Sequence, residues 1–222
     1  MTLPLDHREK KGLFITFEGI EGSGKTKHIS EVFDRLKNAG YPVILTREPG
    51  GTRIGEKIRN IILDPDFTEF DPSTELLLYL ATRAQHVHEI ILPSLDENKI
   101  ILCDRFHDST YAYQGGGRGI DVKLIEPLIE TLFQNLKPDL TFLLDLPPRE
   151  SLERIQSRSR RLNRIDAESL AFHETVRSNY LMLVNNDPGR FRVINSSGEY
   201  PEVHKEIMQD INLLLKNYHH EI

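Results

Sequence analysis

The sequence predicts a three-layer α/β fold, in which a five-stranded parallel sheet is flanked by helices. Three observations lead to this prediction. Short apolar runs alternate with longer segments of helical periodicity along the chain. No internal repeat, low-complexity tract or linker divides the 222 residues, so a single domain is expected. Near the start, the phosphate-binding pattern G-x-x-x-x-G-K-[ST] is matched by Gly19-Ile20-Glu21-Gly22-Ser23-Gly24-Lys25-Thr26.

A predicted strand and a predicted helix flank this loop. Residues 13–17 are apolar, β-branched or aromatic, and residues 25–38 carry apolar side chains at helical spacing. Loop glycines let successive N–H groups point inward at phosphate, while Lys25 can reach the outer phosphates and Thr26 can ligate Mg²⁺. The context therefore indicates a nucleoside triphosphate site. A glycine-rich turn with an incidental lysine is the alternative.

The other elements alternate in the same way. Residues 41–45 follow Gly40 as a second strand, parallel to the first through a right-handed crossover. Further strands are predicted at 99–104, 140–144 and 191–194, and helices at 54–63, 73–95, 122–134, 167–186 and 201–218, with one more beginning at Pro147-Pro148.

Composition limits the possible functions. The formal net charge of −6 is spread along the chain, which argues against general nucleic-acid binding. A single cysteine, Cys103, excludes an internal disulfide and fits a reducing cytoplasm. Residues 1–12 are polar and mixed in charge, so we expect a flexible leader rather than a signal peptide or membrane span. A cytoplasmic protein is expected, with one domain at 13–222 and no membrane or nucleic-acid partner.

The predicted helix at 73–95 contains an apolar block, residues 76–81, that covers all sides of the helix. Such a helix must be covered on two sides. The sheet can cover one side, and the other requires a further helix or a second subunit. A homodimer is therefore expected.

Two predicted strands end in an acid that could steady a magnesium ion. Their positions, Asp104 and Asp145, do not choose between them. Asp104 is followed by Arg105 and a polar, glycine-rich segment, whereas Asp145 is followed by residues typical of the start of a helix. We therefore prefer Asp104, together with Thr26, as the metal ligands, and the alternative for Asp145 is a structural helix cap.

Four separated blocks resemble bacterial thymidylate kinases. They occur in the order of that family: residues 17–26 (FEGIEGSGKT), 46–52 (TREPGGT), 78–83 (LYLATR), and 104–106 (DRF) with Ser109 and 112–115 (AYQG). The similarity extends from about residue 13 to the last predicted helix. It implies a P-loop kinase fold and Mg²⁺-assisted transfer of phosphate from ATP to dTMP, giving dTDP.

The resemblance also implies which residues hold the acceptor phosphate and the sugar. Arg47, Arg59 and Arg105 are expected around the phosphate, with Glu48 helping to orient them. The alternative for each arginine is a surface ion pair. Glu21 is expected beside the sugar 3′-hydroxyl. Near the 2′ carbon, Tyr113 is expected to favour deoxyribose.

A second group of residues is expected to bind the base. Tyr79 and Arg83 lie four residues apart on one helix face, where a ring can stack on a base and a guanidinium can bond its carbonyl. By resemblance, the amide oxygen of Gln114 accepts the pyrimidine N3–H and rejects cytosine. Ser109 and Thr110 are expected among the same binding residues. The family usually has phenylalanine where Tyr79 stands, and core packing is the alternative for this tyrosine.

Five arginines between positions 154 and 164 predict a lid over about residues 154–166: Arg154, Arg158, Arg160, Arg161 and Arg164. They fall on two helical faces, so a straight helix could not aim all of them at one phosphate. Some thymidylate kinases carry an arginine in the phosphate loop, where this chain has Gly22 and Ser23. The missing cation is therefore expected from the lid, with Arg158 and Arg164 preferred. Asn163 stands where the family commonly has aspartate. The alternative is a solvated basic face.

Three other functions share some of these features. A GTP-dependent switch would need an N-K-x-D segment, and residues 98–101 (NKII) lack the aspartate. Another kinase, acting on dCMP or a deoxynucleoside, would differ mainly in the base pocket, where Arg83 and Gln114 separate the two. A non-catalytic ATP-binding scaffold would not need Lys25, Asp104 and the lid arginines together.

Overall fold

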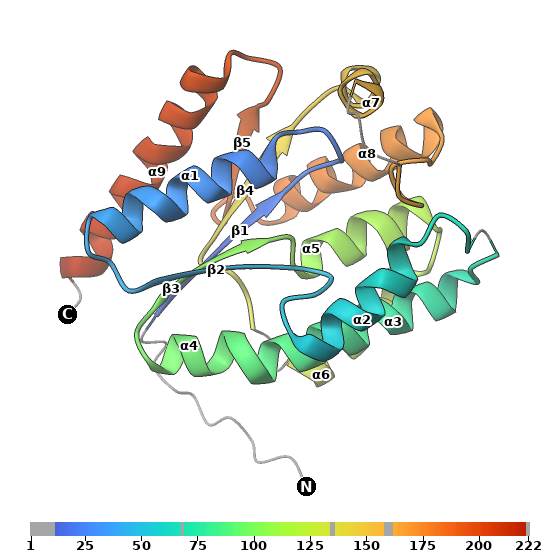
Figure 1. Cartoon of the computed structure of the whole chain (residues 1–222), viewed down its shortest axis with the longest axis horizontal. Coiled ribbons are helices and arrows are strands. Elements are labelled where there is room, and N and C mark those ends of the chain that lie inside the picture. Colours follow the sequence, from blue (N-terminus) through green and yellow to red (C-terminus); the bar gives the residue numbers. More distant parts are fainter. Residues whose placement is uncertain (1–11, 68, 134–135, 158–161, 221–222) are drawn as a thin grey trace, which may run out of the picture.

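The structure, a computed structural model, describes residues 12–67, 69–133, 136–157 and 162–220. Its core is one parallel sheet, with the strand order β2-β3-β1-β4-β5 (Figure 1). The strands are β1 (Leu13–Glu18), β2 (Val43–Arg47), β3 (Ile100–Asp104), β4 (Leu140–Asp145) and β5 (Phe191–Asn195). The predicted five-stranded parallel sheet is therefore confirmed.

The helices of the described residues lie at or near their predicted positions, with two additions. They are α1 (Lys25–Asn38), α2 (Arg53–Leu63), α3 (Pro72–His86), η1 (Val87–Ile91), α4 (Leu92–Asp96), α5 (His107–Thr110), η2 (Tyr111–Gly117), α6 (Val122–Phe133), α7 (Pro148–Gln156), α8 (Leu170–Asn186) and α9 (Tyr200–His220).

Helices cover both faces of the sheet. Alternate side chains of β1 point to opposite faces, as a strand requires. Ile15 joins one apolar cluster with Ile29 of α1 and Ile207 of α9, while Phe14 joins another with residues of α3, α4 and α6. Figure 1 shows α1 and α9 on one face and α4 and α6 on the other. This is the expected three-layer arrangement.

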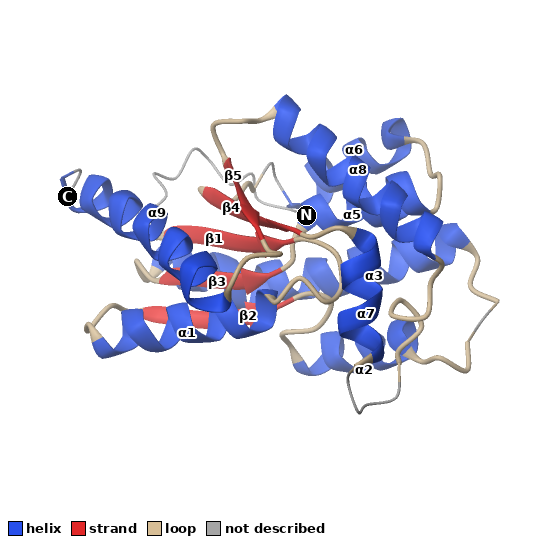
Figure 2. Cartoon of the chain, turned by 90° about the horizontal axis from the view of Figure 1, so that it is seen from above, coloured by secondary structure: helices blue, strands red, loops and turns tan. Residues whose placement is uncertain are grey.

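The order of the strands creates a switch point at β1. The chain places β3 and β2 on one side of β1, and β4 and β5 on the other. Phe17 of β1 pairs with Asp104 of β3, and Glu18 pairs with Leu143 of β4, so three strand ends meet. Open α/β sheets bind ligands beyond the carboxyl ends of the strands at such a point. Figure 2 shows α2, α3, α7 and α8 gathered at this end of the sheet.

The predicted helix at 73–95 is three consecutive pieces. The α-helix α3 passes into the π-helix η1 and then into α4, which carries Pro93. Because proline has no N–H, it cannot complete the bond to the carbonyl four residues back, and a π segment accommodates the change.

No helix was predicted for residues 107–117, which form α5 and the π-helix η2. Their polar and glycine-rich composition gives no helical signal, and packing against α8 supplies the order. A Cβ on Gly117 would lie 2.6 Å from the Phe172 ring, so glycine permits this approach.

Most of the predicted leader, residues 1–11, lies outside the described residues. Gly12 is buried beside β1, so the folded domain includes it. Within the described ranges, no helix is long and apolar enough to cross a membrane.

Candidate active site

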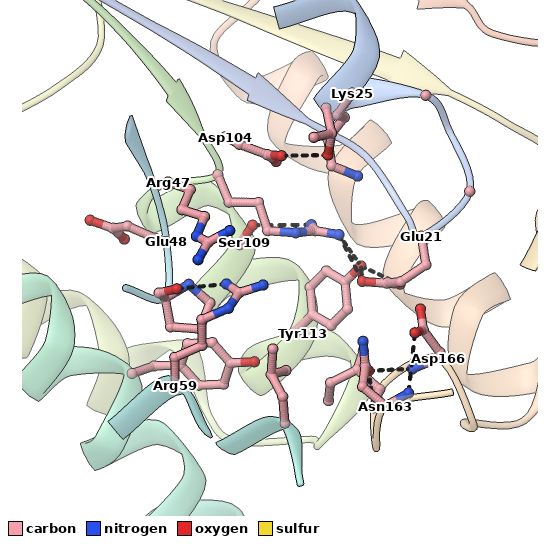
Figure 3. A pocket seen from close by; sticks show the side chains of 18 of the residues that line it. Glu21, Lys25, Arg47, Glu48, Arg59, Asp104, Ser109, Tyr113, Asn163 and Asp166 are labelled. Atoms are coloured by element: carbon pink, nitrogen blue, oxygen red, sulfur yellow. Dashed lines mark hydrogen bonds and ion pairs between the residues drawn. The ribbon is translucent and has the colours of Figure 1, made fainter. Parts of the chain in front are cut away.

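A cavity of about 430 Å³ lies beyond the carboxyl ends of the strands (Figure 3). This volume suits a small-molecule site. Its lining comes from six separate segments of the chain: Glu21, Gly22, Gly24, Lys25, Thr26 and Lys27; Arg47, Glu48 and Pro49; Arg59 and Leu63; Tyr79; Asp104, Arg105, Ser109, Tyr113 and Gln114; and Asn163, Ile165 and Asp166.

The phosphate loop connects β1 to α1. Gly19 has φ +134°, and a Cβ there would lie 2.4 Å from the Leu144 carbonyl oxygen, so only glycine fits. Lys25 Nζ donates to the carbonyls of Gly19 and Ile20, at 2.8 and 2.9 Å. Burial, with the nearby positive charge of Arg105, lowers the pKa of Lys25 to about 8. The loop therefore holds a buried lysine whose partners among the described residues are two loop carbonyls and the Ser23 hydroxyl, all uncharged.

One strand-end acid meets the loop threonine. Thr26 Oγ1 donates to Asp104 Oδ2 at 2.9 Å. The other acid, Asp145, accepts two bonds from Arg177 of α8, at 2.6 and 2.7 Å. Asp145 therefore holds α8 by an ion pair instead of capping a helix, and the geometry favours Asp104 as the acid of the site.

Arg105, directly after β3, lines the cavity. Its φ of +72° is strained for a residue with a side chain, a feature that clusters at functional sites. One guanidinium nitrogen donates to Tyr180, and the other to Glu21 at 2.7 Å and Tyr113 at 3.0 Å. Burial opposes the charge, but Tyr113, Tyr180 and Glu21 raise the pKa of Arg105 well above its ordinary value.

Glu21 of the phosphate loop projects into the cavity from the side across from Arg47 (Figure 3). Both of its carboxylate oxygens accept from the Tyr113 hydroxyl, at 2.9 and 2.8 Å. Burial raises the pKa of Glu21, but Arg105 and Lys25 outweigh burial and lower it below the ordinary value. The site therefore presents one fixed anion beside its cations.

Two further arginines line the cavity with Arg105. Arg47 is more than half exposed and pairs with Glu56 at 2.9 Å. Arg59 donates to the Pro49 carbonyl at 2.6 Å, and burial together with Arg47 lowers its pKa. Three guanidinium groups therefore border one space, and in the described part of the chain Arg47 forms a surface ion pair.

Glu48 holds other partners than expected. It accepts from Arg83 Nε at 2.6 Å and contacts His86 Nδ1 at 2.9 Å, rather than orienting the three arginines of the cavity. The Glu48 side chain is only 2% exposed, and its two carboxylate oxygens are taken by Arg83 and His86. Arg83 also donates to Thr110 at 2.7 Å. Arg83 and Thr110 lie behind the cavity wall, outside its lining.

Gln114 lines the cavity, and its amide is hydrogen-bonded to a residue outside the cavity lining. Nε2 donates to Glu75 Oε1 at 2.8 Å. Glu75 also pairs with Arg118 at 3.1 Å and with Arg164 at 2.6 Å. Tyr79, one turn along α3 from Glu75, lines the cavity as expected.

The predicted lid is only partly described. Positions Arg158, Arg160 and Arg161 lie outside the described residues. Arg164 pairs with Glu75, donates to the Ile62 carbonyl at 2.9 Å, and lies outside the cavity lining. Arg154 donates to the Ser196 carbonyl at 3.0 Å.

Several buried polar residues of the site were not found from the sequence. Glu18 accepts from Ser109 at 2.6 Å and Tyr180 at 2.7 Å, and burial together with Asp108 raises its pKa to about 7. An acid at the end of an apolar strand was a visible signal for Glu18. By contrast, Tyr180 lies 162 positions away and gave none.

Comparisons with known proteins point to one family. The family model for thymidylate kinase matches residues 17–207. A thymidylate kinase of Pelobacter propionicus is 47% identical over 205 residues, covering 90% of this chain and 94% of the relative. One from Syntrophotalea carbinolica is 49% identical over 195 residues, covering 86% and 90%. The crystal structure of thymidylate kinase from Ehrlichia chaffeensis superposes with a TM-score of 0.74 at 36% identity, covering 90% of this chain and 98% of that one.

Proposed function

The chain belongs to the thymidylate kinase family, and we propose that the cavity described above is where it transfers phosphate from ATP to dTMP, giving dTDP. The observation that carries the proposal is the meeting of a phosphate loop with three arginines around one cavity. Phosphoryl transfer leaves little covalent work for the protein, so catalysis depends on positioning and on neutralising charge. Both tasks require this arrangement.

The donor end of the site is the phosphate loop. Its backbone N–H groups would hold the phosphates of ATP, and Lys25 would exchange its loop carbonyls for phosphate oxygens. Thr26 and Asp104 offer two oxygen ligands that already contact each other, which fits Mg²⁺ because this ion takes one or two protein oxygens and completes its shell with phosphates and water. Held by Thr26 and Asp104, Mg²⁺ would supply positive charge against the negative charge that develops on the transferred phosphate.

The acceptor end of the site is bordered by Arg47, Arg59 and Arg105, which would hold the phosphate of dTMP. Glu21 would accept a hydrogen bond from the sugar 3′-hydroxyl. Tyr113, which is fixed by its hydrogen bonds to Glu21, would lie against the 2′ carbon and leave little room for a 2′-hydroxyl. This arrangement would select a deoxyribonucleotide and point its phosphate toward the loop.

The base would lie between Tyr79 and Gln114. Tyr79 supplies a ring for stacking, and the Gln114 amide oxygen accepts N3–H. Arg83 and Thr110 act from behind the wall. The guanidinium of Arg83 donates to Glu48, Thr110 and the Phe106 carbonyl, so it would support the wall against which the base lies.

The lid would supply a cation late in the reaction. Of the preferred positions Arg158 and Arg164, the structure pairs Arg164 with Glu75. Arg164 would therefore have to leave Glu75 before it could reach a phosphate.

We also propose a cytoplasmic homodimer. Leu77 of α3 is 60% exposed, and α6 carries a stripe in which Leu124, Leu128 and Leu132 are 64%, 36% and 38% exposed. These leucines are spaced four residues apart, so they share one side of α6. Apolar side chains gathered in this way are typical of a protein interface.

Product analysis tests the reaction. With ATP, dTMP and Mg²⁺, chromatography should show dTDP and ADP formed in equal amounts. Lys25→Ala should lower the rate on the order of 10² or more, because a cation that contacts the transferred group is lost. Lys57→Ala, on the exposed side of α2, is the matched control. The absence of dTDP, or a folded Lys25→Ala variant with the parent's rate, would contradict the assignment.

A further inference from the structure

We propose that Glu75 is a positioning residue that fixes the orientation of the Gln114 amide and so sets which pyrimidine the enzyme accepts. The inference rests on the proposed function, because it requires the base to lie against Gln114. Glu75 itself is absent from the cavity lining and would touch no substrate.

The contact between the two side chains is buried and directional. Glu75 and Gln114 are each 1% exposed, and Gln114 Nε2 lies 2.8 Å from Glu75 Oε1. An ionised carboxylate can only accept hydrogen bonds, whereas an amide has a donating end and an accepting end. The NH₂ end of Gln114 must therefore face Glu75. The oxygen, Oε1, is the end left for a ligand in the cavity.

Two arginines keep Glu75 ionised in this buried place. Burial alone raises the pKa of a carboxyl group, but the bonds from Arg118 and Gln114 and the charge of Arg164 lower the pKa of Glu75 below its ordinary value. Arg118 also pairs with Glu168 at 2.6 Å, so the cluster contains two acids and two arginines. Without these cations a buried glutamic acid could be protonated and could donate, and the amide would lose its fixed direction.

The orientation of the amide decides between two bases. Thymine carries a hydrogen on N3, which Oε1 of Gln114 can accept, whereas cytosine presents a lone pair there. With the amide reversed, its NH₂ group would donate to cytosine N3 and clash with the thymine N3–H. A site whose buried polar groups are left unpaired by the wrong substrate discriminates strongly against it. Glu75 thus determines which base is accepted by fixing the orientation of Gln114, the residue that contacts the base.

Glu75→Gln tests the inference, because a glutamine can both donate and accept and no longer forbids rotation of the Gln114 amide. We expect the ratio of kcat/KM for dTMP to that for dCMP to fall about 10-fold or more, since one well-made buried hydrogen bond supplies about that discrimination. The loss should come from a higher KM for dTMP and a gain for dCMP, with kcat for dTMP little changed. A variant that loses activity equally toward both nucleotides would overturn the inference.

Glu168→Gln is the matched control. It removes the other carboxylate of the same cluster, which contacts Arg118 but has no hydrogen bond to Gln114. Its base ratio should match the parent's. An equal fall in ratio for both variants would assign the effect to the charge of the cluster and overturn the role of Glu75.

A double variant tests whether Glu75 acts through Gln114. In a Gln114→Ala background, adding Glu75→Gln should leave the base ratio where Gln114→Ala alone puts it, because the amide to be oriented is gone. Independent, additive losses would contradict the proposed route through Gln114.

A measurement on the parent protein covers the case in which Glu75→Gln does not fold. The side-chain NH₂ signals of Gln114, assigned by their loss in Gln114→Ala, should exchange slowly with solvent in the ligand-free protein and remain slow when dTMP is added. Rapid exchange before dTMP is added would place the NH₂ end in the cavity and overturn the proposal. This result is independent of catalysis, so it is distinguishable from a failure of the parent to phosphorylate dTMP.

Discussion

At the scale of single residues, the site depends on carboxylates that have lost contact with water. Glu18, Glu48, Glu75 and Asp108 are each at most 4% exposed. A buried charge is costly unless it is paired and hydrogen-bonded, and each of these acids has such partners. Asp108, for example, accepts two bonds from Arg190, at 2.6 and 2.9 Å. Removing one of these partners should therefore lower the stability of the protein by more than the value of one hydrogen bond, because the carboxylate would stay buried without its partner.

His107 provides a pH test at the same scale. It is 5% exposed, and burial lowers its pKa from 6.5 to about 4, although Asp108 opposes the shift. As the pH falls, His107 therefore binds a proton near pH 6.5 in the unfolded chain but only near pH 4 in the folded one. The contribution of His107 to stability is complete above pH 6.5 and is lost as the pH falls toward 4, by up to roughly 1.4 kcal/mol per pH unit.

Urea unfolding of the parent and His107→Gln at pH 7, 6 and 5 measures this contribution. Glu18 acts in the opposite direction, because its raised pKa of about 7 makes the folded state bind a proton first as the pH falls. The comparison must therefore be parent against variant. The free energy of unfolding should fall less steeply with acid in His107→Gln than in the parent, and parallel curves would contradict the assignment. His88→Gln controls for the loss of an exposed imidazole.

At the scale of elements, the contact between α8 and η2 brings two parts of the site together. It places Tyr180 of α8 beside Glu18 at the end of β1, and His173 of α8 beside Glu21 of the phosphate loop. The approach requires a residue without a side chain at Gly117, where a Cβ would lie 2.6 Å from Phe172. The shape of the cavity thus depends on how α8 packs against η2, which carries the lining residues Tyr113 and Gln114.

Gly117→Ala should destabilise the protein by about 1–3 kcal/mol, since an added methyl group overpacks this contact. Gly189→Ala is the matched control, because a Cβ there meets nothing within 4 Å. Its free energy of unfolding should stay within about 0.5 kcal/mol of the parent's. Urea unfolding measures both, and equal stability of the two variants would show that α8 and η2 adjust freely.

The lid gives a kinetic prediction. Alanine substitutions at Arg158, Arg160, Arg161 and Arg164 should divide into one or two severe cases, with kcat reduced by roughly 10³ or more, and mild ones. KM should change little, because a cation that meets the phosphate only in the closed state stabilises the transition state selectively. Steady-state kinetics at saturating ATP and dTMP measures this. If all four variants kept the parent's kcat, none of these arginines would supply the cation of the transition state.

Local signals explain which elements and residues were predictable. The loop motif is continuous in sequence, and Asp104 follows an apolar strand, so both could be placed without coordinates. Residues 107–117 could not be assigned as helix, because their order comes from packing against α8. The position of Glu75 behind Gln114 also depends on the packing of α3 against η2, which sequence spacing does not reveal.

At the scale of the whole molecule, the strand order explains why distant segments share one cavity. The ends of β1 and β3 lie side by side, which places the phosphate loop next to Asp104 and Arg105. This convergence follows from a parallel sheet, because the carboxyl ends of its strands share one edge. The fully buried position of Arg83 was not predictable, since helical periodicity gives the face of a residue but not the depth to which it is covered.

We expect two copies of the chain to form a dimer through the apolar side of α6. Light scattering at micromolar concentration should give the mass of a dimer for the parent. The double variant Leu124→Glu/Leu128→Glu should shift it toward the monomer, because two charges would be placed in the proposed apolar interface. Met182→Glu, at a 51% exposed apolar position on α8, should remain dimeric. A monomeric parent would remove the dimer from the account.

The central claim is that this cavity selects dTMP as the phosphate acceptor. The most direct test compares kcat/KM for dTMP, dUMP, dCMP, dAMP and dGMP with saturating ATP and Mg²⁺, by coupled detection of ADP. We expect a strong signal with dTMP, a weak one with dUMP, and little with the other three. Of these five bases, only thymine and uracil present an N3–H to the Gln114 oxygen. Equal or better use of dCMP, or of either purine nucleotide, would contradict the claim.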